Sequence, residues 1–402
     1  MENLNTSKMK ASKVIIIILA CLVAFGPLSI DMYLSALPSI ASDLNVGASQ
    51  VKQTVTIFLV GFSFGMLVYG PLSDRYGRKK LLIIGILFYL MATIGILFIK
   101  SIEALLAFRL LQALGGASAS VLARAIVRDL YPLNEAAKIL SWMNIVTMVA
   151  TIIAPLFGSF LLKWFDWQSI FMFLFIFAGV TLLSFVLKIP ETHVKSSRLI
   201  SLTHVIAGYY SVLKDSKAMT LIVCMSSAFA GMFVYITLSP FIFIKFFNFT
   251  EQQYAYLFAS NITGILIMTF INASIVTRLG PLKMVTLCTL ILFISALGLL
   301  FFTLIWIVPV GIMASLFFFV AMTGSLNANC IALLLGMYEK NAGTASGLAI
   351  SIQFGLGGGM SFLVSLLTTT NPWPMGIFMF VMGSISLVAL LLFKRSVSCK
   401  VG

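Results

Sequence analysis

Charged side chains are scarce in this sequence and make up only 9% of its 402 residues. Soluble domains carry about 25% charged residues, so an ordinary soluble domain is excluded. Apolar residues reach 60%, and apolar runs of roughly 20 residues, each long enough to cross a bilayer as a helix, recur along the chain. The composition therefore predicts an all-α polytopic membrane protein.

Residues that hold metals or perform nucleophilic chemistry are also few. The 2 histidines, His193 and His204, fall in one hydrophilic stretch without a ligand cluster, and the 5 cysteines show no CxxC spacing. The sequence contains no nucleophile–base set and no GxxxxGK(S/T) nucleotide loop. It thus predicts neither an enzyme nor a protein that holds a metal or a cofactor.

The apolar runs divide into twelve predicted membrane-spanning helices. Their ends follow from charges, from Gly and Pro turns and from length. No charge occurs from Met284 to Leu335, so Trp306 and Pro309 decide the division there. The predicted helices are 14–38, 51–72, 81–99, 102–127, 138–163, 168–188, 218–244, 253–276, 283–304, 308–335, 343–369 and 374–394.

Basic residues outnumber acidic ones by 26 to 12, and their distribution orients the predicted helices. Twenty of the 26 fall on the face that holds both termini and the central linker, and only Lys52, Lys100, Lys163 and Lys245 fall on the other. The positive-inside rule makes the crowded face cytoplasmic, so both termini are expected there. The net charge of +14 then reflects orientation in the membrane, and no nucleic-acid partner is expected.

A hydrophilic stretch divides the predicted helices into six and six. We expect an N-terminal bundle over 1–188, a cytoplasmic linker over 189–217 and a C-terminal bundle over 218–402. Apolar residues at helical spacing in the linker favour an amphipathic helix on the inner membrane surface, and an irregular tether is the alternative. The residues with that spacing are Leu199, Leu202, Val205, Ile206, Tyr209 and Leu213.

The two halves share a weak internal repeat. GPLSDRYGRKK at 70–80 aligns with ASIVTRLGPLK at 273–283, and each segment follows the second helix of its half. Duplicated halves are typical of transporters built from two pseudo-symmetric bundles. The residues kept are Arg75 with Arg278, Gly77 with Gly280, and Lys80 with Lys283.

One acid and one base lie in the outer halves of the first and fourth predicted helices. Asp31 and Arg109 each interrupt a long apolar run. Ionisable residues inside a membrane are costly and are functional by default. We therefore expect Asp31 and Arg109 to meet and to couple protonation to transport. A static pair that holds the two helices together is the alternative.

Arg124 predicts a polar stripe on the fourth helix. It lies 15 residues after Arg109, so about 22 Å further along the axis, on nearly the same face, with Gly116 and Ser120 between. The stripe favours the wall of a water-accessible cavity that takes neutral polar or anionic compounds. In the alternative interpretation, Arg124 extends to the cytoplasmic surface.

The second half offers aromatic and amide side chains in place of a membrane-embedded acid. Such groups facing a cavity suit a drug-like ligand with few hydrogen bonds, although each alone is more often a packing residue. With Tyr33 and Gln112 of the first half, they complete the predicted substrate cavity. These residues are Phe229, Phe233, Tyr235, Asn261, Asn329 and Gln353.

Several segments of the first half carry a resemblance to a known family. The segment 70–80 resembles the signature loop between helices 2 and 3 of the major facilitator superfamily. RLLQALGG at 109–116 resembles the helix-4 motif of its drug:proton antiporters, and SIDMYLSALP at 29–38 resembles the helix-1 motif of their 12-helix branch. With RAIVRDLYP at 124–132, the set is most similar to the Bcr/CflA group, which includes bicyclomycin and chloramphenicol/florfenicol exporters.

The resemblance implies gating roles for two groups of residues. In the signature loop, glycines allow a tight turn, and an acid among bases is expected to latch the inner gate by charge-assisted bonds. Membrane topology alone is the alternative for the bases. In the fifth helix, a proline predicts a kink and a glycine predicts close packing. The predicted gating residues are Gly70, Asp74, Arg75, Gly77, Arg78, Pro155 and Gly158.

The resemblance also implies a function. It indicates the major facilitator fold and proton-coupled efflux of small drug-like compounds, such as phenicol- or bicyclomycin-type antibiotics, across the bacterial inner membrane by alternating access. The expected partners are protons, the small-molecule substrate and the lipid bilayer, and a monomer suffices. An exporter or importer of one endogenous metabolite, such as a siderophore, is the alternative, and an uncoupled channel is a further one.

Overall fold

The computed structural model describes residues 13–191, 202–338, 342–367 and 371–398. These ranges contain helices and no strand, and twelve helical spans are long and apolar enough to cross a membrane, which confirms the predicted all-α fold. The helices of the first half are α1 (Lys13–Asp31), η1 (Leu34–Ala36), α2 (Leu37–Asp43), α3 (Ala48–Tyr76), α4 (Arg78–Ile96), α5 (Ile102–Leu130), α6 (Leu133–Trp164) and α7 (Gln168–Lys188). The remaining helices are α8 (Leu202–Lys214), α9 (Ser216–Pro240), η2 (Phe241–Phe246), α10 (Glu251–Leu279), α11 (Pro281–Leu304), α12 (Pro309–Met337), α13 (Ala342–Ser365) and α14 (Trp373–Ser398).

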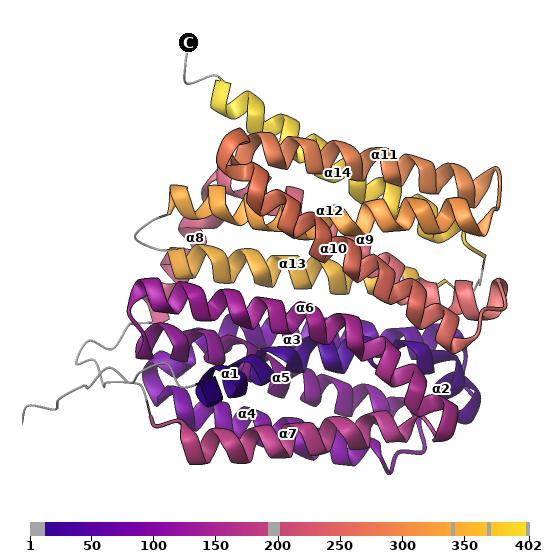
Figure 1. The fold of residues 1–402 in the computed structure, drawn as a ribbon, viewed down its shortest axis with the longest axis horizontal. Coiled ribbons are helices and arrows are strands. Elements are labelled where there is room, and N and C mark those ends of the chain that lie inside the picture. The colour runs from indigo at the N-terminus through magenta and orange to yellow at the C-terminus, as the bar shows by residue number, and fades with distance from the viewer. Residues whose placement is uncertain (1–12, 192–201, 339–341, 368–370, 399–402) are drawn as a thin grey trace, which may run out of the picture.

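The long helices form two bundles that lie side by side, α1 to α7 in one and α9 to α14 in the other (Figure 1). We call them the N-terminal and C-terminal bundles. They meet mainly where α3 packs against α13 and α6 packs against α10. We call the end of the molecule at which α8 lies the linker end, and the end at which α2 and η2 lie the opposite end.

The repeat predicted at the second loop of each half has a common backbone geometry. Gly77 ends α3 and begins α4 with φ of 97°, and Gly280 ends α10 and begins α11 with φ of 80°. Glycine adopts positive φ without the steric cost that other residues meet. The two conserved glycines of the repeat therefore make the same sharp turn between consecutive helices.

The first predicted helix is interrupted where its acid lies. α1 ends at Asp31, and the chain continues through η1 and α2 to complete the first span. Gly158 of α6 lies directly against this break, because a Cβ atom there would overlap the carbonyl oxygen of Met32. The close helix approach predicted at Gly158 is thus present, and Pro155 lies inside the same helix.

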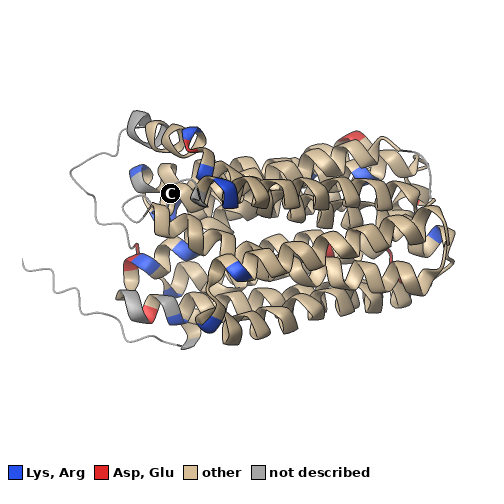
Figure 2. Ribbon diagram, turned by 90° about the horizontal axis from the view of Figure 1, so that it is seen from above, with Lys and Arg blue, Asp and Glu red and all other residues tan. Residues whose placement is uncertain are grey.

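Charge and apolar surface are distributed as in a membrane-spanning protein. Figure 2 shows that the lysines and arginines gather at the linker end of the helices. Large apolar side chains are exposed along the sides of the bundles, such as Leu187 at 70% and Ile294 at 66%. Side chains of this kind are stable against lipid and costly against water.

The linker contains a helix, as one of the two sequence interpretations expects. α8 packs against α13 and α9, Val212 is fully buried, and a Cβ atom on Gly208 would lie 3.1 Å from Thr344 Cγ2. The helix is therefore held against the C-terminal bundle. The predicted division at Trp306 is also confirmed, because α11 ends at Leu304 and α12 begins at Pro309.

Candidate functional site

Polar contacts join the two bundles at the opposite end. Ser39 Oγ donates a hydrogen bond to Glu251 Oε1 at 3.2 Å. The hydroxyl oxygens of Thr56 and Ser361 are 2.9 Å apart. Because each pair takes one residue from each bundle, these contacts close the space between the bundles at this end.

Lys52 is a further contact between the bundles, and sequence reasoning missed it. The sequence placed Lys52 at the start of the second predicted helix, as a charge on the outer face, but the side chain is fully buried. Its Nζ donates to the Leu367 carbonyl oxygen at 3.2 Å and lies 5.0 Å from the centroid of the Phe241 ring. The position of Lys52 near a helix start looks like a surface charge in sequence, and only the packing of α13 and η2 around it reveals its burial.

An aromatic layer lies between the bundles, nearer the middle of the helices. It consists of Phe58 and Phe62 of α3, Phe229 and Phe233 of α9, and Phe354 of α13. The ring centroids of Phe62 and Phe354 are 5.1 Å apart, as are those of Phe229 and Phe354. These rings exclude water from the middle of the interface, and two of the predicted cavity residues, Phe229 and Phe233, belong to the layer.

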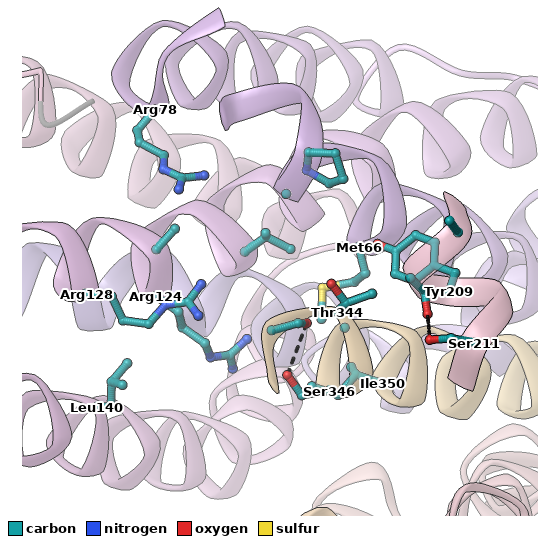
Figure 3. A pocket seen from close by; sticks show the side chains of 18 residues that line it. Met66, Arg78, Arg124, Arg128, Leu140, Tyr209, Ser211, Thr344, Ser346 and Ile350 are labelled. Carbon is teal, nitrogen blue, oxygen red and sulfur yellow. Dashed lines mark hydrogen bonds between the residues drawn. The ribbon is translucent and has the colours of Figure 1, made fainter. Parts of the chain in front are cut away.

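A cavity of about 900 Å³ lies between the bundles on the linker side of the aromatic layer. Met66 and Ile350, each four residues from a phenylalanine of the layer, line it. Arg124 lines it as the sequence predicts, and Gly70 and Arg78 of the signature loop also reach it (Figure 3). The cavity therefore lies between the bundles at the linker end, whereas the polar contacts described above join the bundles at the opposite end.

All other predicted cavity residues lie outside the lining of this cavity, and their part in substrate binding stays a prediction. Asn261 Nδ2 donates to Tyr235 Oη at 2.9 Å, and Asn329 Nδ2 donates to Asn272 Oδ1 at 2.6 Å, so these amides bond within their own bundle. The predicted residues outside this lining are Tyr33, Gln112, Gly116, Ser120, Phe229, Phe233, Tyr235, Asn261, Asn329 and Gln353.

Arg109 is fully buried within the N-terminal bundle. Its Nη1 donates to the Ser29 carbonyl oxygen at 3.0 Å and to Gln112 Oε1 at 2.7 Å. Its guanidinium carbon lies 4.2 Å from the centroid of the Tyr33 ring and 4.4 Å from that of Phe58. The Nε and Nη2 atoms find no hydrogen-bond partner among the described residues, so this buried cation retains unused donors.

Asp31 is also buried, at 5% exposure. No described residue forms a hydrogen bond or an ion pair with its carboxylate, so the expected direct pair with Arg109 is not formed. The carboxyl group lies in the neighbourhood of Tyr235 of α9 and Tyr254 of α10. The reason is the break in the helix: α1 ends at Asp31, whereas Arg109 is bound to Ser29, two residues earlier.

The signature loop is anchored at the linker end by ionic contacts. Arg78 Nε lies 3.1 Å from Asp129 Oδ2 of α5, and Arg78 Nη1 donates to Ser73 Oγ. The side chain of Asp74, the predicted latch, lies outside the described residues. Arg75 is exposed and lies over the Tyr76 ring.

Glu191, just after α7, is an anchor that sequence reasoning did not identify. Its Oε1 accepts hydrogen bonds from the backbone N–H groups of Arg78 at 3.1 Å and Lys79 at 3.3 Å. These N–H groups begin α4 and have no partner inside the helix. A carboxylate is the favoured cap for a helix N-terminus, so an acid shortly after the sixth span was the available signal.

Comparison with known proteins gives a family match and full-length relatives. The Major Facilitator Superfamily matches residues 19–362. The chain is 30% identical to the "Bicyclomycin resistance protein homolog" of Haemophilus influenzae over 96% of both chains. It is 26% identical to the "Chloramphenicol resistance protein" of Pseudomonas aeruginosa over 90% of this chain and 86% of that one.

A solved structure shares the fold at low identity. The xylose transporter XylE from E. coli, in a partially occluded inward open conformation, superposes with a TM-score of 0.73 over 95% of this chain and 97% of that one. The sequence identity is 15%. This likeness establishes the arrangement of the helices and carries no information on substrate.

Proposed function

This chain belongs to the Major Facilitator Superfamily, and on that premise we propose that it exports small drug-like organic compounds across the bacterial inner membrane in exchange for protons. The observation that carries the proposal is a pair of buried, mutually unpaired ionisable groups, Asp31 and Arg109, in the first bundle. The similarity to relatives named for bicyclomycin and chloramphenicol resistance supports compounds of that kind as substrates.

The orientation of the chain follows from its basic residues. We assign the linker end to the cytoplasm, because lysines and arginines gather there (Figure 2) and cytoplasmic loops are enriched in them. Both termini are then cytoplasmic. In this orientation the cavity that Arg124 lines faces the cytoplasm, and the contacts of Lys52 and Ser39 close the outer side.

The proton step uses the separation of Asp31 from Arg109. A buried carboxylate without a cation or donor is costly, whereas the protonated acid is much less so. In the exchange cycle Asp31 therefore takes a proton while the outer side is open and carries it into the inward-facing state. When the proton leaves, the carboxylate requires a partner, and Arg109 Nε and Nη2 are unused cationic donors within the same bundle.

The approach of Asp31 to Arg109 also changes the packing between the bundles. Movement of Asp31 toward Arg109 removes its charge from the vicinity of Tyr235 and Tyr254 in the C-terminal bundle. Arg109 also contacts Phe58 of the aromatic layer. The protonation state of one acid therefore changes contacts next to the interface between the bundles, which is a requirement for coupled alternating access.

The proposal is tested by Asp31→Asn in proteoliposomes with chloramphenicol as substrate and an imposed pH gradient. We expect gradient-driven accumulation to be lost, while substrate binding and monodisperse purification persist. Asp166→Asn is the matched control, because Asp166 is an exposed loop acid. Gradient-driven transport that survives Asp31→Asn would show that the proton is carried elsewhere.

A further inference from the structure

The wall of the cavity contributed by α4 and α5 carries three arginines and no acid. Arg78, Arg124 and Arg128 line it. Asp129 neutralises Arg78 at 3.1 Å, but neither Arg124 nor Arg128 has a carboxylate partner among the described residues. Arg124 Nη1 bonds only to Ser120, to the carbonyl oxygen at 3.4 Å and to Oγ at 3.3 Å. Two guanidinium groups thus face the cavity with their charge uncompensated.

These two arginines are placed unfavourably unless an anion joins them. Arg124 and Arg128 are four residues apart on α5, and like charges at this spacing repel each other on a helix. Arg124 is half-buried and Arg128 is exposed, so the repulsion is screened less than between two fully exposed side chains. A carboxylate or phosphate between them would relieve the repulsion and accept charge-assisted hydrogen bonds from both, for which the planar guanidinium is well suited.

The opposite wall of the cavity supplies complementary donors from the C-terminal bundle. The first turn of α13 lines it with Gly343, Thr344 and Ser346. A Cβ atom on Gly343 would lie 3.8 Å from Arg128 Nη1, so Arg128 reaches the start of this helix, as Figure 3 shows. The positive end of the α13 dipole and the side chain of Thr344 therefore face the same space as the arginines, whereas the Ser346 hydroxyl donates to the Gly343 carbonyl oxygen at 3.3 Å.

Apart from the hydroxyl groups of Tyr209 and Ser211, the rest of the lining is apolar. Met66, Val121, Leu140 and Ile350 face the cavity from four different helices. Its volume of about 900 Å³ falls within the range of sites that hold drug-sized ligands. A ligand that uses the whole cavity therefore has one anionic group and an apolar body.

We infer that this cavity binds amphiphilic organic anions, with the anionic group held between Arg124, Arg128 and the start of α13. The inference deepens the proposed export function and rests on it only for the direction in which the ligand moves. Cationic compounds are disfavoured by the same charges. Because the anion contacts both bundles, its binding draws them together at the linker end, which is the movement that alternating access requires there.

The test compares two probes of equal shape on the purified full chain in phosphatidylcholine nanodiscs. Naphthalene-2-carboxylate should bind about tenfold or more tightly than naphthalene-2-carboxamide, as expected when charge-assisted bonds replace neutral ones. Arg124→Gln and Arg128→Gln should each remove most of this preference. Arg278→Gln, at an exposed arginine outside the cavity, should leave it unchanged. Equal affinities for the two probes, or a preference that survives both cavity substitutions, overturns the inference.

Two further arms keep the result interpretable. Nanodiscs of phosphatidylglycerol show whether the bound anion is a lipid. If this lipid competes with the carboxylate probe, the site binds a lipid phosphate; if it does not compete, the site binds soluble anions. If a Gln variant aggregates, ionic strength decides instead, because the preference of the unmodified chain must fall as salt rises, and a salt-independent preference overturns the inference. Binding needs no proton gradient, so a failure of proton coupling would leave these measurements unaffected.

Discussion

The two bundles share a fold but differ in where they bury charge. Asp31, Lys52 and Arg109 are the buried charged residues among those the structure describes, and all three belong to the N-terminal bundle. The C-terminal bundle buries only neutral polar groups in its described part, and some of them bond to one another, as Asn329 does to Asn272. One half therefore carries the ionisable chemistry, and the other provides aromatic and hydroxyl surfaces against which it moves.

The sharpest test of this comparison removes a buried polar side chain from each bundle. Arg109→Ala loses two hydrogen bonds, each worth about 1.5–3 kcal/mol for a charged donor, so gradient-driven transport should fall by about 100-fold or more. Asn272→Ala, in the C-terminal bundle, should cost about 1–3 kcal/mol of stability and leave the transport rate within about threefold. Initial rates in proteoliposomes and thermal unfolding measure both effects. Equal losses of transport in the two variants would show that the difference in buried charge between the bundles does not affect transport.

A second substitution tests the buried cation that bridges the bundles. Lys52 has a single carbonyl acceptor and one ring contact. The closed state of the outer side, which buries this charge, is therefore less stable than it would be with an apolar side chain of similar size at position 52. Lys52→Met should therefore stabilise the closed state of this side. The measurement is the rate at which an impermeant maleimide labels Thr56→Cys in a background without native cysteines. This rate should fall by about tenfold for each 1.4 kcal/mol by which the closed state is stabilised. Lys100→Met, at an exposed lysine, is the control. Faster labelling in Lys52→Met would reverse the assigned effect of the charge.

The smallest expected difference separates the two glycines of the repeat. Alanine at either position must adopt a positive φ, which costs about 1–2 kcal/mol. At Gly77 the new Cβ would also lie 3.1 Å from Glu191 Oε2, whereas at Gly280 it would meet nothing within 4 Å. Gly77→Ala should therefore lower the midpoint of thermal unfolding more than Gly280→Ala. The opposite order would indicate that the Glu191 anchor adds nothing to the first turn.

The helices could be read from sequence because membrane thickness and local composition determine them. Apolar length and the residues at 306–309 were enough to divide the longest uncharged run, and the repeat located both glycine turns. Helical spacing also placed Arg124 on a polar face, although Gly116 and Ser120 of that face lie outside the lining of the cavity. These inferences use information that is local in the chain.

The contacts of the buried ionisable groups could not be read in the same way. Whether Asp31 meets Arg109 depends on the break in α1 and on the approach of α6 at Gly158, which no helical period reveals. The burial of Lys52 depends on η2 and α13, which lie far away in the sequence. Charge positions were thus predictable along the helices, but their partners were determined by packing between helices.

The attachment of α8 to the start of α13 makes the connecting helix travel with the C-terminal half. Gly208 and Thr344 are in close contact, and both line the cavity. In any rocking of the two halves, α8 then keeps its position beside the start of α13 at the mouth of the cavity. The mouth of the cavity is consequently bounded on one side by two helices that move together, and its width changes by displacement of the side that carries Arg124 and Arg128.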